Sequence, residues 1–321
     1  MSIIYCTIID ESYVPRALVL RDSIMRHSPS AYFSFYCADN AAADMLDLYA
    51  RERTYVVRPE KYETSELRAI KCVSKLSEYC WTCKPAILIH AMQSDLQPQW
   101  VVWLDSDMMA YGDIGITFDR YSDASVVLSP HRSTLPKFAA YEPIVGKFNA
   151  GFVAFQTSNE GREALDWWMV QCLQGCPAEP DGSRYADQKY LNSIPSLFPN
   201  AVASDSPGLN CAPWNVFGRD IVIDGNRVTV DGEPLLLYHF QGLKIIRSWA
   251  YDLYGAQPAL PKLVRGAIYR QYLHALSAQI RDCAARVGRP LFGIDYGFAG
   301  LAGLFTAAKR MRWCPNLVLK I

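Results

Sequence analysis

Two aspartates separated by one residue are the strongest local signal in this 321-residue chain. Asp105 and Asp107 follow directly after the apolar run at 100–104. Alternate residues of an extended segment project to the same side, so both carboxylates can bind one hard divalent cation such as Mn²⁺ or Mg²⁺. These ions commonly keep open positions for substrate phosphates. The alternative interpretation is a turn or a cap at the end of a strand.

A second polar group combines amides, an acid and a glycine. Asn149 and Gly151 open the strand-like segment 147–155. The amide can donate and accept hydrogen bonds, and glycine lets a ligand approach the backbone, which together suit sugar hydroxyls. A bulge or tight turn explains these two residues equally well. Asp187 and Gln188 precede a helical run, where Asp187 can be an N-cap without any chemistry.

A lone histidine closes a third apolar strand. His239 follows the apolar segment 235–238 and is itself followed by Gly242 and Lys244. Histidine is a suitable further ligand for manganese, and Gly-x-Lys can present a backbone amide and a cation to a diphosphate. A purely structural histidine is the alternative interpretation.

Ten cysteines occur in a chain that begins without the basic segment and apolar stretch of a signal peptide. We therefore expect a protein made in the cytosol whose thiols are reduced and largely buried. The spacing of Cys80, Cys83, Cys172 and Cys176 leaves a structural zinc site as the alternative.

The segments that must position these residues alternate between apolar strands and helical patterns. This order predicts an α/β fold in which acids at the carboxyl edge of a sheet meet the ligand. No GxGxxG or Walker A sequence is present, which argues against a dehydrogenase or a P-loop NTPase. The expected strands are 3–9, 31–37, 55–57, 100–104, 124–128, 147–155 and 235–238, and the expected helices are 17–25, 41–51 and 77–92.

Composition is that of an ordinary globular protein, with half of the residues apolar and 32 basic side chains against 32 acidic ones. Disorder, collagen and coiled coil are excluded on these grounds. A balanced charge also removes the electrostatic attraction that nucleic-acid binding requires, so we expect no nucleic acid as a partner.

The charge is unevenly distributed along the chain. Residues 1–260 carry 22 Lys and Arg against 30 Asp and Glu, whereas residues 261–321 carry 10 against 2. This asymmetry predicts a domain at 1–260 and a separate basic, aromatic-rich extension at 261–321. Two roles are open for the extension: it contacts anionic lipid at the inner face of the membrane, or it forms a helical cap on the first domain. Its aromatics include Tyr269, Tyr272, Phe292, Tyr296, Phe298, Phe305 and Trp313.

Taken in order, several segments resemble the landmarks of glycosyltransferase family 8, which includes glycogenin and bacterial lipopolysaccharide galactosyltransferases. The segments are 5–20, 105–107, 148–151, 187–192 and 239–244, within a resemblance that covers about residues 3–250. Segments 78–83, 167–168 and 212–215 are similar to poorly characterised bacterial relatives thought to build surface polysaccharides. The resemblance implies a GT-A fold, which is a Rossmann-like mixed sheet flanked by helices.

The resemblance also implies roles for individual residues. In the family, positions matching Thr7, Asp10 and Tyr13 hold the uridine of a nucleotide sugar, with the tyrosine ring against the base. Asp105, Asp107 and His239 match the three ligands of a manganese ion. The remaining matches surround the donor and its diphosphate: Lys84, Ser106, Asn149, Gly151, Asp187, Gln188, Gly242 and Lys244. The family usually places its last lysine three residues after the glycine, whereas Lys244 comes one residue early and no Pro-Trp follows.

The implied activity is retaining transfer of a sugar from a nucleotide donor, a UDP-sugar in this family, to a saccharide or lipid-linked acceptor of surface polysaccharide or lipopolysaccharide. The leaving diphosphate would be stabilised by the metal and Lys244. Either Asp187 or Gln188 contacts the oxocarbenium-like centre, or attack occurs from the front side without a protein nucleophile.

Two other classes of function remain open from the sequence. A sugar-nucleotide nucleotidyltransferase has a similar layered sheet, but should carry a glycine-rich loop after the first strand, and residues 6–13 contain no glycine. A catalytically silent binding protein would tolerate loss of the metal ligands, all three of which are present.

Overall fold

The computed structural model describes the whole chain except residues 226, 248–249, 290–314 and 320–321. A seven-stranded mixed sheet forms its centre, in the order β3-β2-β1-β4-β7-β6-β8. Six of these strands run in the same direction, and β7 runs antiparallel to both of its neighbours. The central strands are β1 (Ile3–Ile9), β2 (Tyr32–Cys37), β3 (Thr54–Val57), β4 (Trp100–Leu104), β6 (Val126–Pro130), β7 (Phe148–Gln156) and β8 (Ala201–Ala203).

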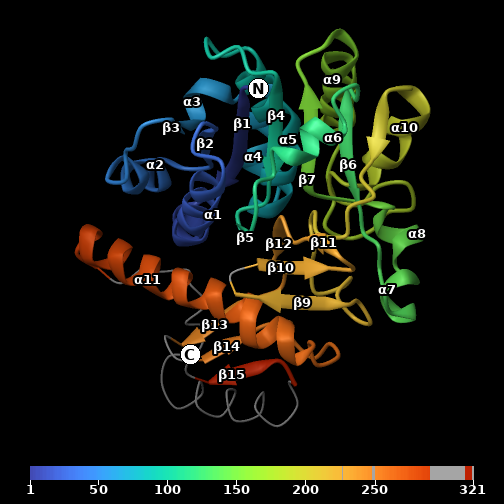
Figure 1. Cartoon of the computed structure of the whole chain (residues 1–321). Coiled ribbons are helices and arrows are strands. Elements are labelled where there is room, and N and C mark those ends of the chain that lie inside the picture. The colour runs from blue at the N-terminus through green and yellow to red at the C-terminus, as the bar shows by residue number, and fades with distance from the viewer. Residues whose placement is uncertain (226, 248–249, 290–314, 320–321) are drawn as a thin grey trace.

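Helices cover both faces of this sheet (Figure 1). Strand β1 is buried along its whole length and divides its side chains between two cores. Tyr5 belongs to the core that includes α1, and Cys6 belongs to the core that includes α5 and α9. A continuous apolar strand without polar alternation is typical of a sheet covered on both sides. The larger helices are α1 (Val14–His27), α2 (Asn40–Asp47), α4 (Ser65–Val73), α5 (Leu76–Met92), α9 (Asn159–Leu173) and α11 (Arg270–Val287).

Short elements complete the chain around the sheet. They include the helices α3 (Pro59–Tyr62), α6 (Ile116–Arg120), α7 (Pro136–Ala139), α8 (Glu142–Val145) and α10 (Ile194–Leu197), with helical turns at Glu11–Tyr13, Lys189–Ser193 and Val264–Tyr269. A two-stranded sheet pairs β5 (Met108–Ala110) with β12 (Leu237–His239). One three-stranded sheet consists of β9 (Ile221–Asp224), β10 (Arg227–Val230) and β11 (Glu233–Pro234). Another consists of β13 (Lys244–Arg247), β14 (Ala250–Asp252) and β15 (Leu317–Leu319).

Most of the expected elements are found, and three expectations are corrected. The strand expected at 124–128 is β6, two residues later, because the backbone N–H of Ser125 bonds to the loop carbonyl of Asn200. The helix expected at 41–51 ends at Asp47 in a tight turn. The run after Asp187 is a short 3₁₀ helix whose N-cap is Gln188, so the N-cap interpretation of Asp187 is wrong.

The described part of the C-terminal extension packs against the first 260 residues. Tyr269 and Tyr272 are buried in the same core as Leu237 and Phe240, and the ring of Tyr272 stacks on Phe240 with centroids 3.7 Å apart. These two tyrosines are therefore unavailable to a membrane, since apolar packing has already covered them. The other expected interfacial aromatics, Phe292, Tyr296, Phe298, Phe305 and Trp313, lie outside the described residues.

Helix α11 lies across the end of the molecule opposite the N-terminus and contacts α1 (Figure 1). Just beyond it, Arg289 forms an ion pair with Glu11. Within the described residues, no helix combines the length and apolar character needed to cross a membrane.

Candidate functional site

Three potential metal ligands converge at the carboxyl end of β4. One oxygen of Asp105, one of Asp107 and one nitrogen of His239 all lie within 4.8 Å of one another. His239 is brought there by the antiparallel pairing of β12 with β5, in which it faces Met108. Its Nε2 is 3.1 Å from Asp107 Oδ1 and 3.8 Å from Asp105 Oδ2. Two carboxylates and one imidazole are a donor set that suits Mn²⁺ or Mg²⁺.

The electrostatics of this group also fit a cation. Burial lowers the pKa of His239, but Asp107 and Asp105 raise it above its usual value. Burial raises the pKa of Asp107, yet the neighbouring positive charges, chiefly His239, bring it below its usual value. The two carboxylates that favour a positive charge on the imidazole would favour a divalent ion in the same way, and metal binding would displace protons from its ligands.

Lys84 connects the acidic pair to a second buried carboxylate. It lies in α5 with only 3 % of its surface exposed. Its Nζ is 3.0 Å from Asp105 Oδ1 and 3.1 Å from Asp187 Oδ2, and it donates a hydrogen bond to the carbonyl oxygen of Ala150 at 3.0 Å. Three oxygen atoms thus lie within 3.1 Å of the ammonium group. Burial lowers the pKa of Lys84, but the two aspartates raise it well above its usual value.

Asp187 is held between this lysine and α9. Its carbonyl oxygen accepts a hydrogen bond from Trp168 Nε1 at 3.1 Å. Burial raises the pKa of Asp187 to about 6, although Lys84 opposes the shift. The carboxylate is thus a buried anion held by one cation.

An amide network fixes the other polar side chains. Asn149 Oδ1 accepts hydrogen bonds from the backbone N–H of Gly151 and from Asn210 Nδ2, both at 3.0 Å. Asn149 Nδ2 donates to Gln188 Oε1 at 3.3 Å, and Gln188 Nε2 donates to the carbonyl oxygen of Val145 at 2.9 Å. These bonds define which amide oxygens and nitrogens face the open space.

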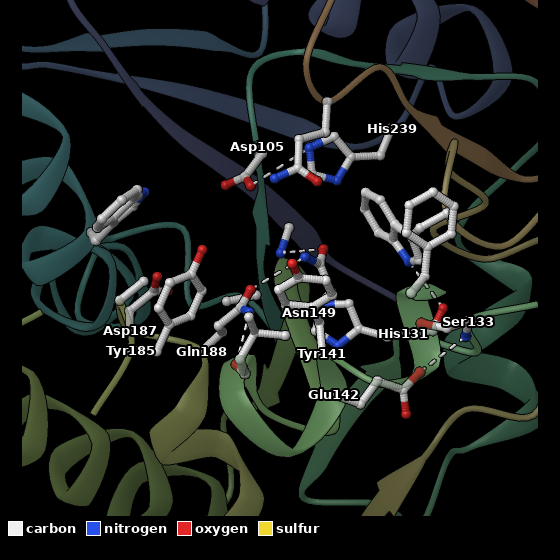
Figure 2. Close-up of a pocket in the computed structure, with 18 of the residues that line it drawn as sticks. Asp105, His131, Ser133, Tyr141, Glu142, Asn149, Tyr185, Asp187, Gln188 and His239 are labelled. Carbon is white, nitrogen blue, oxygen red and sulfur yellow. Dashed lines mark hydrogen bonds and ion pairs between the residues drawn. The ribbon is translucent and has the colours of Figure 1, made fainter. Parts of the chain in front are cut away.

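Two cavities meet at the metal-ligand group. The first has a volume of about 370 Å³, and Figure 2 shows Asp105 and His239 on one side of it and Asn149, Gln188 and His131 on others. The second, of about 340 Å³, is lined by Asp10, Tyr13, Ser106 and Asp107 among others. Trp81, Asp105, His239 and Gln241 line both. After the ligands that the resemblance to family 8 implies for their residues, we call them the sugar cavity and the nucleotide cavity.

The predicted site residues are distributed unevenly over these cavities. Lys84, Asp105, Asn149, Gly151, Asp187, Gln188 and His239 line the sugar cavity, and Asp10, Tyr13, Ser106 and Asp107 line the nucleotide cavity. Thr7 is fully buried in β1, and its hydroxyl has no hydrogen-bond partner among the residues that the structure describes. Gly242 and Lys244 are exposed and line neither cavity.

Several cavity residues were missed by the sequence interpretation. They are mostly aromatic: Trp81, Phe138, Tyr141, Tyr185, Trp214 and Tyr254, with His131 beside them. His131 directly follows β6, at the same edge of the sheet as Asp105. Its position at a strand end is the one signal by which the sequence could have identified it. The aromatics come from loops and short helices far apart in the chain, so their convergence has no local pattern.

The cysteines do not form a metal site in the described part of the chain. Asp105, Asp107 and His239 are the one group of three or more potential ligands found there, and Cys83, Cys172 and Cys176 are buried free thiols. The structural zinc alternative is therefore unsupported.

Gly151 should be intolerant of any side chain. A Cβ built there would lie 2.6 Å from Asn149 Oδ1 and 2.7 Å from both His239 Nδ1 and Met108 Cε. We expect Gly151→Ala to lower the free energy of unfolding by about 1 to 3 kcal/mol, as overpacking does, and to weaken metal binding by displacing His239. Urea denaturation and manganese titration measure these effects. Gly266→Ala is the matched control, because its Cβ would meet nothing within 4 Å; equal stability of the two variants would contradict the prediction.

Two Bacillus subtilis proteins are similar in sequence to this chain. No protein-family model matches the sequence. The uncharacterized Bacillus subtilis protein YfnF is 30 % identical over 253 residues, which is 77 % of this chain and 83 % of that protein. YfnD of the same organism is 30 % identical over 251 residues, 78 % of this chain and 80 % of that protein.

The fold is shared with a solved glycosyltransferase. The galactosyltransferase LgtC in complex with donor and acceptor sugar analogues superposes with a TM-score of 0.50 at 17 % identity, covering 83 % of this chain and 99 % of that one. An active-site mutant of LgtC gives a TM-score of 0.51 at 14 % identity, covering 87 % and 96 %. The central sheet and its helices thus form a GT-A fold. By sequence, the chain belongs to the same protein family as YfnF and YfnD.

Proposed function

We propose that this protein is a metal-dependent glycosyltransferase that uses a nucleotide sugar, preferentially a UDP-sugar, as donor. The observation that carries the proposal is the position of Asp105, Asp107 and His239, which line the junction between two cavities. A donor bridging the two cavities places its diphosphate at this junction. The crystallised LgtC complex holds donor and acceptor sugar analogues, which agrees with this division of the site.

Asp105, Asp107 and His239 would hold Mn²⁺ or Mg²⁺. The ion supplies positive charge to the diphosphate as the bond to the sugar breaks. Tyr13 and Asp10 lie where the nucleoside binds, and the half-exposed ring of Tyr13 can stack on the base.

The sugar itself occupies the other cavity. The amides of Asn149 and Gln188 offer donors and acceptors to its hydroxyls, and Lys84 keeps Asp187 ionised beside them. Asp187 or Gln188 is the group for contact with the oxocarbenium-like centre in a retaining reaction, and front-side attack is the other route.

The acceptor is a saccharide, free or lipid-linked, as the resemblance to family 8 and to builders of surface polysaccharide or lipopolysaccharide suggests. The aromatic side chains of Tyr141, Tyr185 and Trp214 give the sugar cavity apolar walls with a few polar groups, as in many small-molecule sites. The donor sugar and the acceptor share this cavity in the proposal.

A thermal-shift panel tests the proposal. The protein is heated with UDP-, GDP- and CMP-sugars, with and without Mn²⁺. A specific donor present at 100 times its Kd stabilises the folded state by about 2.7 kcal/mol. Stabilisation by one nucleotide class only with the metal supports the proposal, and its absence for every nucleotide contradicts it. Product analysis that finds pyrophosphate and a new nucleotide sugar would instead favour a nucleotidyltransferase.

We further propose that residues 261–321 form a basic extension of the catalytic unit 1–260 that contacts the inner face of the cytoplasmic membrane. Lys262, Arg270 and Arg281 are exposed in its described part. Each basic residue near an anionic surface contributes roughly 1 kcal/mol.

Liposome sedimentation of the full chain measures this contact. We expect binding to anionic but not neutral vesicles, weakened by salt and by the double substitution Arg270→Glu and Arg281→Glu. Truncation after residue 260 is unsuitable, because it removes Tyr269 and Tyr272 from the core. Failure to bind anionic vesicles at low salt would contradict the membrane proposal.

A further inference from the structure

Arg16, on helix α1, is a buried cation without an acidic partner. Only 7 % of the residue is exposed. Its one hydrogen bond is long, from Nη2 to the carbonyl oxygen of Leu243 at 3.5 Å. Among the described residues, no carboxylate forms an ion pair with it. Charged side chains are seldom buried unless paired, so this position calls for an explanation.

Arg21, five residues later on the same helix, shows the ordinary arrangement. It is fully buried, pairs with Asp22 at 2.7 Å and donates to the carbonyl oxygen of Tyr49 at 3.2 Å. Its remaining Nη2 is a buried atom without a partner. No nitrogen of Arg16 is both buried and without a partner. Those of its N–H groups that make no hydrogen bond are therefore accessible at the surface. Arg16 therefore has free donors at an accessible point.

The surroundings of Arg16 belong to the proposed donor site. Its guanidinium carbon is 4.7 Å from the centroid of the Tyr13 ring, and Tyr13 lines the nucleotide cavity together with Asp107. Leu243 lies in the segment that follows His239. Arg16 is thus joined through the Tyr13 ring to the cavity that Asp107 also lines.

The cation expected at the diphosphate is elsewhere. Lys244 is exposed at the start of β13, lines neither cavity and, among the described residues, forms no ion pair or cation–π contact with a side chain that lines the nucleotide cavity, whereas Arg16 lies against Tyr13. Its shifted position in the sequence is consistent with this. A dianionic or trianionic diphosphate between Tyr13 and the metal ligands would therefore lack a lysine contact from this segment.

We propose that Arg16 supplies the cationic contact to the donor diphosphate in place of Lys244. This inference rests on the proposed function. The planar guanidinium presents paired N–H donors that match phosphate oxygens, and a buried unpaired cation gains its missing anion when the nucleotide binds. Arg16 lines neither cavity itself, so the diphosphate reaches its free N–H groups at the edge formed by Tyr13 and Leu243.

A purely structural role predicts different behaviour. If Arg16 only supported the Tyr13 ring through a cation–π contact, its loss would weaken binding of the base and destabilise the protein. If it binds phosphate, its removal should spare the base. It should also leave the melting temperature of the ligand-free protein unchanged or higher, because an unpaired buried charge is removed.

The test compares binding of UDP with Mn²⁺ and binding of uridine, by ligand-observed NMR titration, in wild type, Arg16→Met, Arg16→Lys and the control Lys244→Met. We expect Arg16→Met to weaken UDP binding at least about tenfold, which is 1.4 kcal/mol, with uridine binding within about threefold of wild type. Arg16→Lys should bind UDP with an affinity between those of wild type and Arg16→Met, and Lys244→Met should bind UDP as wild type does.

The outcomes separate the two proposals. Equal UDP affinity in wild type and Arg16→Met overturns the role of Arg16 while leaving the proposed function in place. Equal weakening of UDP and uridine, with a lower melting temperature, assigns Arg16 to structure and also overturns it. Wild-type protein that fails to bind UDP with Mn²⁺ overturns the proposed function and the Arg16 inference together.

Discussion

Replacing Lys84 with methionine should lower the free energy of unfolding by about 3 to 5 kcal/mol, because two carboxylates lose their shared buried partner. Asp105 and Asp187 lie 3.0 and 3.1 Å from Nζ, and Asp187 is almost fully buried. Methionine fills a similar volume, so the loss reflects charge rather than a cavity. Urea denaturation followed by tryptophan fluorescence at neutral pH measures it.

Two further variants separate this effect from general damage. Lys71→Met removes a lysine whose side chain is 34 % exposed, and its buried partner Glu63 still accepts a hydrogen bond from Tyr79, so we expect a smaller loss of about 1 to 2 kcal/mol. Adding Asp187→Asn to Lys84→Met should restore part of the stability, since it removes one of the two unpaired carboxylates. A Lys84→Met variant as stable as Lys71→Met would show that the buried pairs are not formed in solution.

Asp107→Ala should reduce donor turnover at least about 100-fold while the fold survives. Without this carboxylate the metal is held by two ligands, and stabilisation of charge on the leaving diphosphate is worth several kcal/mol. Asp107 packs little apolar surface, and its side chain is 21 % exposed, so the melting temperature should move by only a few degrees. Release of UDP from the donor identified in the thermal-shift panel measures turnover.

Asp123→Ala is the matched control for this substitution, because Asp123 is exposed and lines neither cavity. It should retain wild-type turnover. If Asp107→Ala keeps activity within a few-fold of wild type, the metal site lies elsewhere or is not needed.

The sequence predicted those parts of the site that sit at strand ends. Asp105 directly follows β4, and the carboxyl end of that strand determines where its side chain lies. Asn149 lies near the start of β7 and meets Asp105 only because β7 runs antiparallel to β4. His239 was predicted for the same reason, although the strand before it belongs to a small separate pair with β5 rather than to the main sheet.

What the sequence could not predict depends on tertiary contacts. The antiparallel direction of β7 leaves no trace in an apolar run, because pairing direction does not change which residues are buried. Lys84 meets Asp187 only because α5 and α9 pack together on one face of the sheet. Arg16 directly precedes the helix expected at 17–25, and its missing partner is visible only when its surroundings are known.

The most direct test of the central claim is a calorimetric titration of the wild-type protein with UDP, first in Mn²⁺ and then in EDTA. The two carboxylates and His239 should bind the nucleotide through a shared ion, so we expect the affinity to fall at least about tenfold, or 1.4 kcal/mol, when the metal is removed. Equal affinity in Mn²⁺ and in EDTA would contradict the assignment of Asp105, Asp107 and His239 as a metal site for a nucleotide donor.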